Sequence, residues 1–236
     1  METEFIPVVI HNNKGGRDAE LLKRYDEPSW NNPVMRFVNA SGKDLLPRRD
    51  GVWDTHGIAK RMIASLKAAK EAVPSYLELA ALETRTSGIE TTTFAMSCFW
   101  EGESRLGALA GVTGTRAGWL EGREVVELKF DPKLISYEQL LGQARKMNCL
   151  SHAFVGTEAQ RKIAAATLGD SKASLAKAPA KDAKASDQFY YLKKSPLAKL
   201  ALSPLQKTRI NADLRVGADA KRWLSPRQLR SVGGER

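Results

Sequence analysis

The sequence has few of the residues that mark several common protein classes. It contains two cysteines, Cys98 and Cys149, in 236 residues, so no disulfide framework is expected. Its three histidines are spread along the chain without cysteine partners at ligand spacing, and we expect no structural metal. No apolar run is long enough to span a bilayer, and residues 1–20 are too polar for a secretory signal. These absences predict a soluble, cytoplasmic chain with no membrane partner, if residue 1 is the natural start.

The positive charge is concentrated in the last quarter of the chain. Residues 171–236 contain 15 Lys and Arg against 5 Asp and Glu, whereas residues 1–170 hold 22 of each. A basic segment can bind nucleic acid or an acidic surface, or it can be a solvated segment that keeps a protein soluble. Because this segment has no RNA-stacking motif and no zinc-finger spacing, we expect a solvated tail and no nucleic-acid partner.

The first 72 residues show strand and helix patterns in the order β-α-β-β-α. Runs rich in β-branched and apolar residues predict strands over residues 5–10 and 34–38, and an extended segment over 44–47. Helices are predicted over residues 18–25 and 57–72, and the second of these repeats apolar residues on one face. The pattern therefore predicts a small α/β unit at the start of the chain.

This order, with Asn32-Pro33 directly before the second strand, resembles the C-terminal half of a thioredoxin fold. The resemblance implies that Pro33 is a cis proline beside a redox site; a proline that only begins a strand is the alternative. The Cys-x-x-Cys motif and the first strand and helix of a thioredoxin are absent from the sequence. Either that half was lost, or the chain is a fragment of a longer gene.

The most informative segment surrounds Cys98, between a predicted strand over residues 91–98 and a predicted helix over 101–109. A thiol near a helix N-terminus is stabilised as the reactive thiolate by the positive end of the helix dipole. Phe99 and Trp100 follow at once and predict an apolar wall suited to a small group such as a methyl. The pattern therefore indicates a reactive cysteine; an inert buried cysteine is the alternative.

Further strands are predicted over residues 111–119 and 123–130, followed by a helix over 137–147 with a capping box formed by Ser136 and Gln139. The β-α-β-β-α order again predicts an α/β sandwich. Four regions follow from these patterns: a truncated thioredoxin-like half-domain with a connector helix over residues 1–86, a second α/β domain over 87–167, a linker over 168–188 and a basic helical tail over 189–236.

Several motifs between residues 93 and 141 occur in the order found in the A-type peptide methionine sulfoxide reductases. The matching pieces are Cys98-Phe99-Trp100 in residues 94–100, Gly111-Val112 with Thr115, Gly118-Trp119, Glu124 to Pro132, and residues 135–141. The region over about residues 90–160 thus resembles that family in a shortened form. The resemblance implies a ferredoxin-like α/β sandwich and thiol-dependent reduction of methionine S-sulfoxide, free or peptide-bound.

The resemblance also implies a role for each matched residue. Cys98 is the implied nucleophile, and Phe99, Trp100 and Trp119 are the implied contacts to the substrate. Glu124 is the implied acid, since a sulfoxide oxygen leaves only once it is protonated; a glutamate on a strand surface is the alternative.

The first product at the nucleophile is a sulfenic acid, which a second thiol must resolve. Cys149 is the internal candidate, and a buried residue at a helix end is the alternative. The resemblance implies no bound cofactor and an external dithiol reductant such as thioredoxin. Oxidised proteins or free methionine sulfoxide are the implied substrates.

The chain departs from the family pattern around the nucleophile. Ser97 and Glu101 stand where the family has glycines, and residues 119–124 run through without the family's insertion. The oxygen-binding tyrosines have no match, and residues 152–160 occupy the place of one of them. The alternative function is therefore a degenerate redox sensor or thiol-binding protein without sulfoxide turnover.

Overall fold

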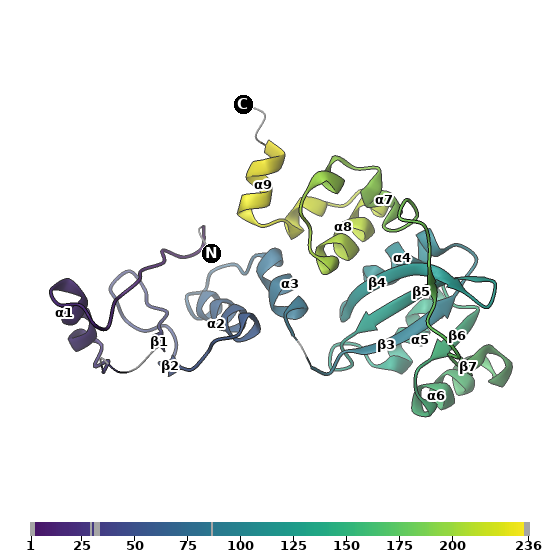
Figure 1. The fold of residues 1–236 in the computed structure, drawn as a ribbon, viewed down its shortest axis with the longest axis horizontal. Helices are drawn as coiled ribbons and strands as arrows, with labels where there is room; N and C mark the ends of the chain where they lie inside the picture. The colour runs from purple at the N-terminus through teal and green to yellow at the C-terminus, as the bar shows by residue number, and fades with distance from the viewer. Residues whose placement is uncertain (1–2, 29, 31–33, 86, 234–236) are drawn as a thin grey trace. The chain divides into compact units, whose positions relative to one another are not determined.

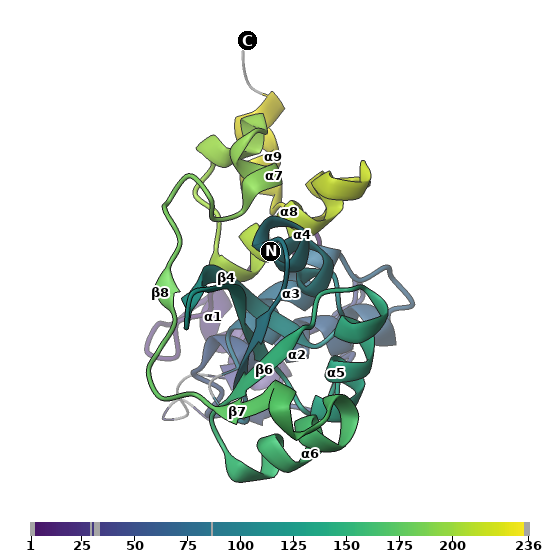
Figure 2. The ribbon, with the colours of Figure 1, turned by 90° about the vertical axis from the view of Figure 1, so that its right-hand side faces the viewer.

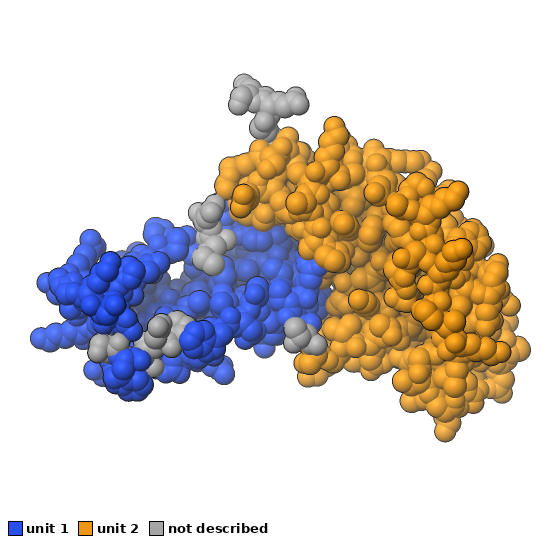
Figure 3. Space-filling view, in the orientation of Figure 1, with its two compact units in different colours: residues 1–85 blue, residues 86–236 orange. Residues whose placement is uncertain are grey.

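The chain folds into two compact units, residues 1–85 and 86–236, which are described separately below (Figure 3). The computed structural model describes residues 3–28, 30, 34–85 and 87–233. The predicted Asn32-Pro33 element lies outside the described residues.

The first unit is mainly helical. It contains helices α1 (Arg17–Arg24), α2 (Thr55–Ala68) and α3 (Ser75–Glu83) and strands β1 (Val34–Met35) and β2 (Arg49–Asp50). The apolar face predicted for the second helix packs a small core in which Met62 and Leu66 of α2 join Phe37 and Leu77. The helix predictions for this unit are thus confirmed.

The strand predictions for the first unit are largely wrong. Residues 5–10 form no strand in the structure, and the side chains of Ile6, Val8 and Val9 are exposed. Of the strand predicted over residues 34–38, only β1 and an isolated bridge between Val38 and Asp44 are paired. Apolar composition alone does not make a strand without a partner edge, and Pro7 removes one backbone donor from the segment. The thioredoxin-like half-domain is therefore not confirmed.

The second unit is built on a six-stranded sheet with strand order β7-β6-β3-β5-β4-β8 (Figure 1). Its centre runs along the chain as β3 (Glu90–Ala95), α4 (Phe99–Gly107), β4 (Val112–Leu120), β5 (Arg123–Phe130), α5 (Tyr137–Lys146) and β6 (His152–Val155). The four central strands pair antiparallel in the order β6-β3-β5-β4. This is the split β-α-β arrangement of ferredoxin-like sandwiches.

The central sheet is held by a continuous apolar core. The fully buried side chains of Phe94, Leu128 and Phe130 belong to the strands, and Leu140 reaches the same cluster from α5. The predicted capping box begins α5: the Gln139 N–H donates to the Ser136 hydroxyl, and the Gln139 side chain accepts the Ser136 N–H. The cap starts α5 soon after β5 ends at Phe130, and the helix carries the chain back towards Cys149.

The predicted linker over residues 168–188 is wrong for the residues that join the sheet. After α6 (Glu158–Leu168) and a short 3₁₀ turn over residues 170–172, β7 (Ala173–Leu175) pairs parallel to β6. β8 (Lys181–Asp182) then pairs antiparallel to β4, and its segment follows the sheet edge in Figure 2. Both strands satisfy backbone groups that the sheet edges would otherwise leave unpaired, which composition does not reveal.

The C-terminal region packs against the second α/β domain. It comprises α7 (Tyr190–Lys193), α8 (Pro204–Val216), α9 (Pro226–Gly233) and short 3₁₀ turns over residues 196–199 and 220–223. Buried Arg209 of α8 donates to the backbone carbonyls of Gly107, Leu109 and Val112. Figures 1 and 2 show these helices at the end of the unit away from α6. Among the residues described, no helix has the length and apolarity to cross a membrane.

Candidate active site

The two cysteines flank the same end of the central sheet. β3 ends at Ala95, shortly before Cys98, and β6 begins at His152, shortly after Cys149. Ala95 and His152 are paired in register, and the N–H and hydroxyl of Ser151 donate to the Ala95 carbonyl at 2.8 and 3.0 Å. The fold thus brings together two thiols that are 51 positions apart in the printed sequence.

Cys98 lies at the N-cap of α4, as the sequence predicts. Its backbone is extended, with φ −150° and ψ 109°, and its carbonyl accepts the N–H of Gly102 in the first helical turn. The thiol is partly exposed and makes no capping hydrogen bond to the helix. The position leaves the sulfur accessible at the N-terminus of α4.

Glu124 binds the backbone on both sides of Cys98. Its Oε2 accepts the N–H of Phe99 at 2.7 Å, and its carbonyl accepts the N–H of Met96 at 3.0 Å. The first contact places the Glu124 carboxyl at the N-terminus of α4. The predicted acid and the predicted nucleophile are therefore brought to one place, with the carboxyl fixed on the residue that follows the thiol.

The three predicted aromatic residues form one cluster. The ring centroids of Phe99 and Trp100 are 6.0 Å apart, and those of Phe99 and Trp119 are 5.6 Å apart with the rings edge to face. Trp119 lies opposite Glu124 across the β4–β5 pairing and is 43% exposed. Within the described part of the chain, the buried indole N–H of Trp100 has no acceptor, so a bound acceptor would satisfy it.

Cys149 lies in a different environment from Cys98. Its side chain is buried, and Sγ donates to the Met147 carbonyl at 3.4 Å. Burial raises the pKa of the Cys149 thiol, the Arg105 guanidinium opposes that change, and the charge of Cys98 adds to it. The influence of Cys98 on Cys149 indicates that the two thiols lie near one another.

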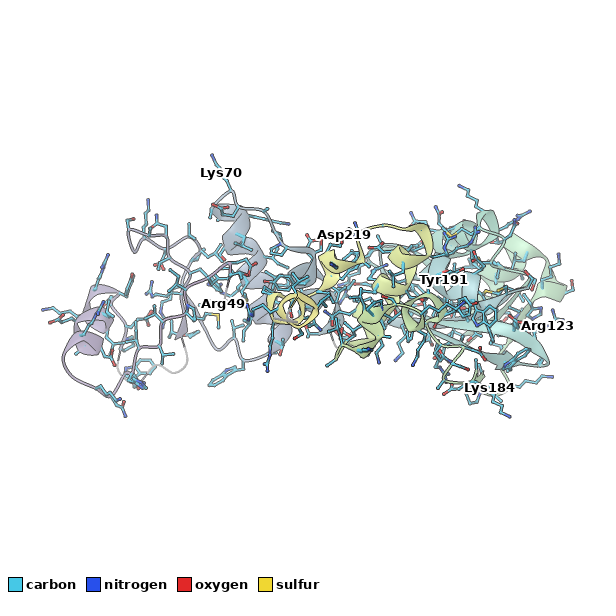
Figure 4. All side chains as sticks on the ribbon, turned by 90° about the horizontal axis from the view of Figure 1, so that it is seen from above. Arg49, Lys70, Arg123, Lys184, Tyr191 and Asp219 are labelled. Atoms are coloured by element: carbon cyan, nitrogen blue, oxygen red, sulfur yellow. The ribbon has the colours of Figure 1, made fainter. Side chains whose placement is uncertain are left out.

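The structure adds a group of polar residues that the sequence did not indicate. Glu101, in the first turn of α4, accepts hydrogen bonds from the Tyr191 hydroxyl and from Arg105 Nε, the latter at 2.8 Å. Arg215 lies 3.5 Å from the same carboxylate. Burial and this hydrogen bond raise the pKa of Tyr191 to about 12, and the charge of Cys98 contributes to the rise. Tyr191 is labelled in Figure 4, among the side chains of the second unit.

Tyr190 also reaches the site, from a position that the sequence did not connect, and its segment contacts Glu103 of α4. The Tyr190 ring stacks on Trp100, with centroids 4.3 Å apart and an interplanar angle of 15°. Glu103 is fully buried and accepts the N–H of Phe189 at 2.6 Å, and burial raises its pKa to about 7. The sequence signal was the aromatic run over residues 189–192, but nothing in its spacing links it to Cys98.

His152, which begins β6, is an interior strand residue. Its Nε2 lies 2.9 Å from the Ser174 hydroxyl on β7, and burial lowers its pKa. Across the described residues, no three His, Cys, Asp or Glu side chains gather in a way that could hold a metal ion.

No family model matches the chain. The peptide methionine sulfoxide reductase MsrA of Rippkaea orientalis is 38% identical over 72 residues, covering 23% of this chain and 33% of that protein. The MsrA of Cronobacter sakazakii is 36% identical over 100 residues, covering 30% and 47%. Part of this chain is similar to MsrA proteins.

The similarity extends beyond bacteria and stays partial. The peptide methionine sulfoxide reductase of Drosophila melanogaster is 39% identical over 64 residues, covering 22% of this chain and 26% of that protein. The chain therefore matches less than half of the length of each of these relatives. The solved methionine sulfoxide reductase A of Corynebacterium diphtheriae is 18% identical with a TM-score of 0.36, covering 52% of this chain and 82% of that one.

Proposed function

We propose that the second unit reduces the S-sulfoxide of methionine, free or in a peptide, at Cys98. The observation that carries the proposal is the hydrogen bond from the Phe99 N–H to Glu124 Oε2 at 2.7 Å. It fixes a carboxyl beside a partly exposed thiol at a helix N-terminus. The partial similarity to MsrA proteins supports the same reaction class.

In the proposed reaction the Cys98 thiolate attacks the sulfoxide sulfur while the Glu124 carboxyl donates a proton to the sulfoxide oxygen. A bond forms between the two sulfurs; the oxygen then moves to the Cys98 sulfur as the S–O bond of the substrate and the bond between the sulfurs break, so Cys98 becomes a sulfenic acid and methionine leaves. The substrate sulfur gains two electrons and the cysteine sulfur loses two. Phe99 and Trp100 offer apolar surface to the substrate methyl group, and Trp119 belongs to the same aromatic cluster beside the thiol.

Cys149 is the proposed resolving residue. Its thiolate would attack the Cys98 sulfenic acid, releasing water and forming a disulfide. Arg105 favours ionisation of Cys149 against the effect of burial, which supports this role. An external dithiol of the thioredoxin type would then return both cysteines to the thiol form, and no bound cofactor is needed in this cycle.

The test is reduction of methyl p-tolyl sulfoxide with dithiothreitol. We expect Cys98→Ser to lower turnover to the background rate, because a hydroxyl is a poor nucleophile towards sulfur. Glu124→Gln keeps the shape of the acid but not its proton, and should lower kcat by about 10²–10⁴-fold. Glu121→Gln, a glutamate on the turn of the same hairpin, is the matched control and should stay within about twofold. Absence of turnover by the intact protein would reject the proposal.

A redox sensor is the second candidate function, favoured by the placement of a partly exposed thiol and a buried thiol at one end of the sheet. Such a pair can form a disulfide after oxidation of Cys98 by peroxide, without a sulfoxide substrate. A protein with no sulfoxide turnover but a reversible Cys98–Cys149 disulfide, identified by mass spectrometry, would support it.

A further inference from the structure

The segment that carries Tyr190 is fixed to the site by specific hydrogen bonds. The Gln188 side chain bonds the backbone of Ala117 in both directions, accepting its N–H at 3.1 Å and donating to its carbonyl at 2.7 Å. The next residue, Phe189, donates its N–H to buried Glu103 at 2.6 Å. Residues 188 and 189 are therefore anchored to β4 and α4, the elements on either side of the aromatic cluster.

The anchoring continues on the other side of Tyr190. The N–H groups of Tyr191 and Leu192 both donate to Oδ1 of Asn211, a fully buried residue of α8, at 2.9 and 3.1 Å. Phe189 adopts a left-handed backbone conformation with φ 51°, which costs a non-glycine residue free energy and persists only where the surroundings hold it. Tyr190 is thus presented in one defined position.

This position covers part of the aromatic wall beside Cys98. Tyr190 stacks on Trp100 with centroids 4.3 Å apart, and the Lys194 ammonium lies 3.8 Å from the Tyr190 centroid. Tyr190 is itself partly exposed, so it borders solvent and is not a core residue. The hydroxyl of its neighbour Tyr191 donates to Glu101 in the first turn of α4, whose N-cap is Cys98, so the segment lies at the end of the helix that carries the thiol.

We propose that Tyr190 determines which sulfoxides reach Cys98, by occupying one face of Trp100 and leaving apolar space for a methyl group but not for larger alkyl groups. The identity of the substrate rests on the proposed function. The steric limit rests on the stacking of Tyr190 on Trp100. In an apolar pocket, each methylene that must be accommodated or rejected changes the ratio of kcat/KM between two substrates about 10–200-fold. An aromatic side chain that borders such a pocket therefore sets specificity.

The first experiment compares methyl phenyl sulfoxide with n-butyl phenyl sulfoxide as substrates. Tyr190→Ala and Tyr190→Leu remove the stacked ring and should raise the butyl-to-methyl ratio of kcat/KM by about tenfold or more. Tyr190→Phe keeps the ring and should leave the ratio within about twofold of the wild type. Trp53→Ala removes an aromatic that is 70% exposed in the first unit and is the matched control.

The second experiment does not depend on sulfoxide reduction. In a Cys149→Ser background, the rates at which N-methylmaleimide and N-cyclohexylmaleimide alkylate Cys98 are compared, since these reagents share their chemistry and differ in size. Tyr190→Ala and Tyr190→Leu should raise the cyclohexyl-to-methyl rate ratio by about tenfold, and Tyr190→Phe should not. Near-ultraviolet circular dichroism identifies any variant that fails to fold. If one of Tyr190→Ala and Tyr190→Leu is unfolded, the rate ratio of the folded one tests the proposal.

The outcomes separate the two proposals. A changed alkylation ratio without sulfoxide turnover by the wild type keeps the role of Tyr190 as a steric limit and rejects the proposed function. Sulfoxide turnover with both ratios unchanged in the folded Tyr190→Ala and Tyr190→Leu variants keeps the proposed function and overturns the role of Tyr190.

Discussion

Glu27 in the first unit and Glu103 in the second are glutamates in opposite electrostatic surroundings. Glu27 accepts hydrogen bonds at 2.8 Å from both Arg36 and Arg48, and Arg48 contributes most to lowering its pKa. Glu103 is fully buried and accepts the Phe189 N–H, and burial raises its pKa to about 7. The first unit neutralises its carboxylate, whereas the second holds an acid that titrates near neutral pH.

The glutamate with the raised pKa lies in the unit that carries the candidate active site. Perturbed acids and thiols cluster at functional sites, because reactions need groups whose protonation changes near neutral pH. The second unit places Glu103 on the helix that begins at Cys98, and it places Cys149, whose pKa is raised by burial, at the same end of the sheet. The first unit has ion pairs and a small core, which are features of structural stabilisation.

The largest effect should come from the buried arginine of the second unit. Arg209→Met removes three hydrogen bonds to backbone carbonyls in the α4–β4 connection and should lower the free energy of unfolding of that unit by about 4 kcal/mol. Arg36→Met in the first unit removes partly exposed contacts to Glu27 and Asp44 and should cost about 1 kcal/mol. Hydrogen exchange with mass spectrometry resolves the two units, and equal losses would break the comparison.

The next largest effect is on the pH dependence of the free energy of unfolding, which Glu103 and Glu27 change with opposite signs. The raised pKa of Glu103 means that its contribution is fully present below pH 4.5 and is lost as pH rises through about 7. Glu103→Gln should therefore gain about 3 kcal/mol relative to the wild type between pH 4.5 and pH 8, an order-of-magnitude value from the shift in pKa.

Glu27→Gln is the matched variant in the first unit. The lowered pKa of Glu27 means that its contribution is present above pH 4.5 and is lost as pH falls, so the variant should be less stable at neutral pH by about 1 kcal/mol or less. Urea unfolding of both variants and the wild type from about pH 2.5 to pH 8 measures the two slopes, the Glu27 slope lying below pH 4.5 and the Glu103 slope above it. Slopes of the same sign would contradict the assigned electrostatics.

Much of the second fold could be predicted because its signals are local. The strand pattern over residues 123–130 and the capping box at Ser136 each report a single element, and each is present. The first strand of the first unit and the linker over residues 168–188 were wrong for a shared reason. Strand formation depends on a partner edge elsewhere in the fold. β7 pairs with β6 and β8 with β4, whereas residues 5–10 pair with no strand.

The candidate site was predictable where its residues follow one another in sequence. Cys98, Phe99 and Trp100 lie on one turn, and Glu124 was found through the resemblance to a family. Tyr190 and Tyr191 are about 90 residues away and reach α4 only because buried Asn211 and Glu103 hold their segment there. Such long-range contacts leave no periodic pattern in the chain.

The central claim is that Cys98 transfers an oxygen atom from methionine sulfoxide and that Cys149 resolves the product. The direct measurement is a single turnover: the reduced protein is mixed with excess methionine S-sulfoxide without any reductant, and methionine and the cysteine products are quantified by mass spectrometry. We expect about one methionine per protein with a Cys98–Cys149 disulfide in the wild type, and about one methionine with a Cys98 sulfenic acid in Cys149→Ser. Absence of methionine from the fully reduced wild type would contradict the account.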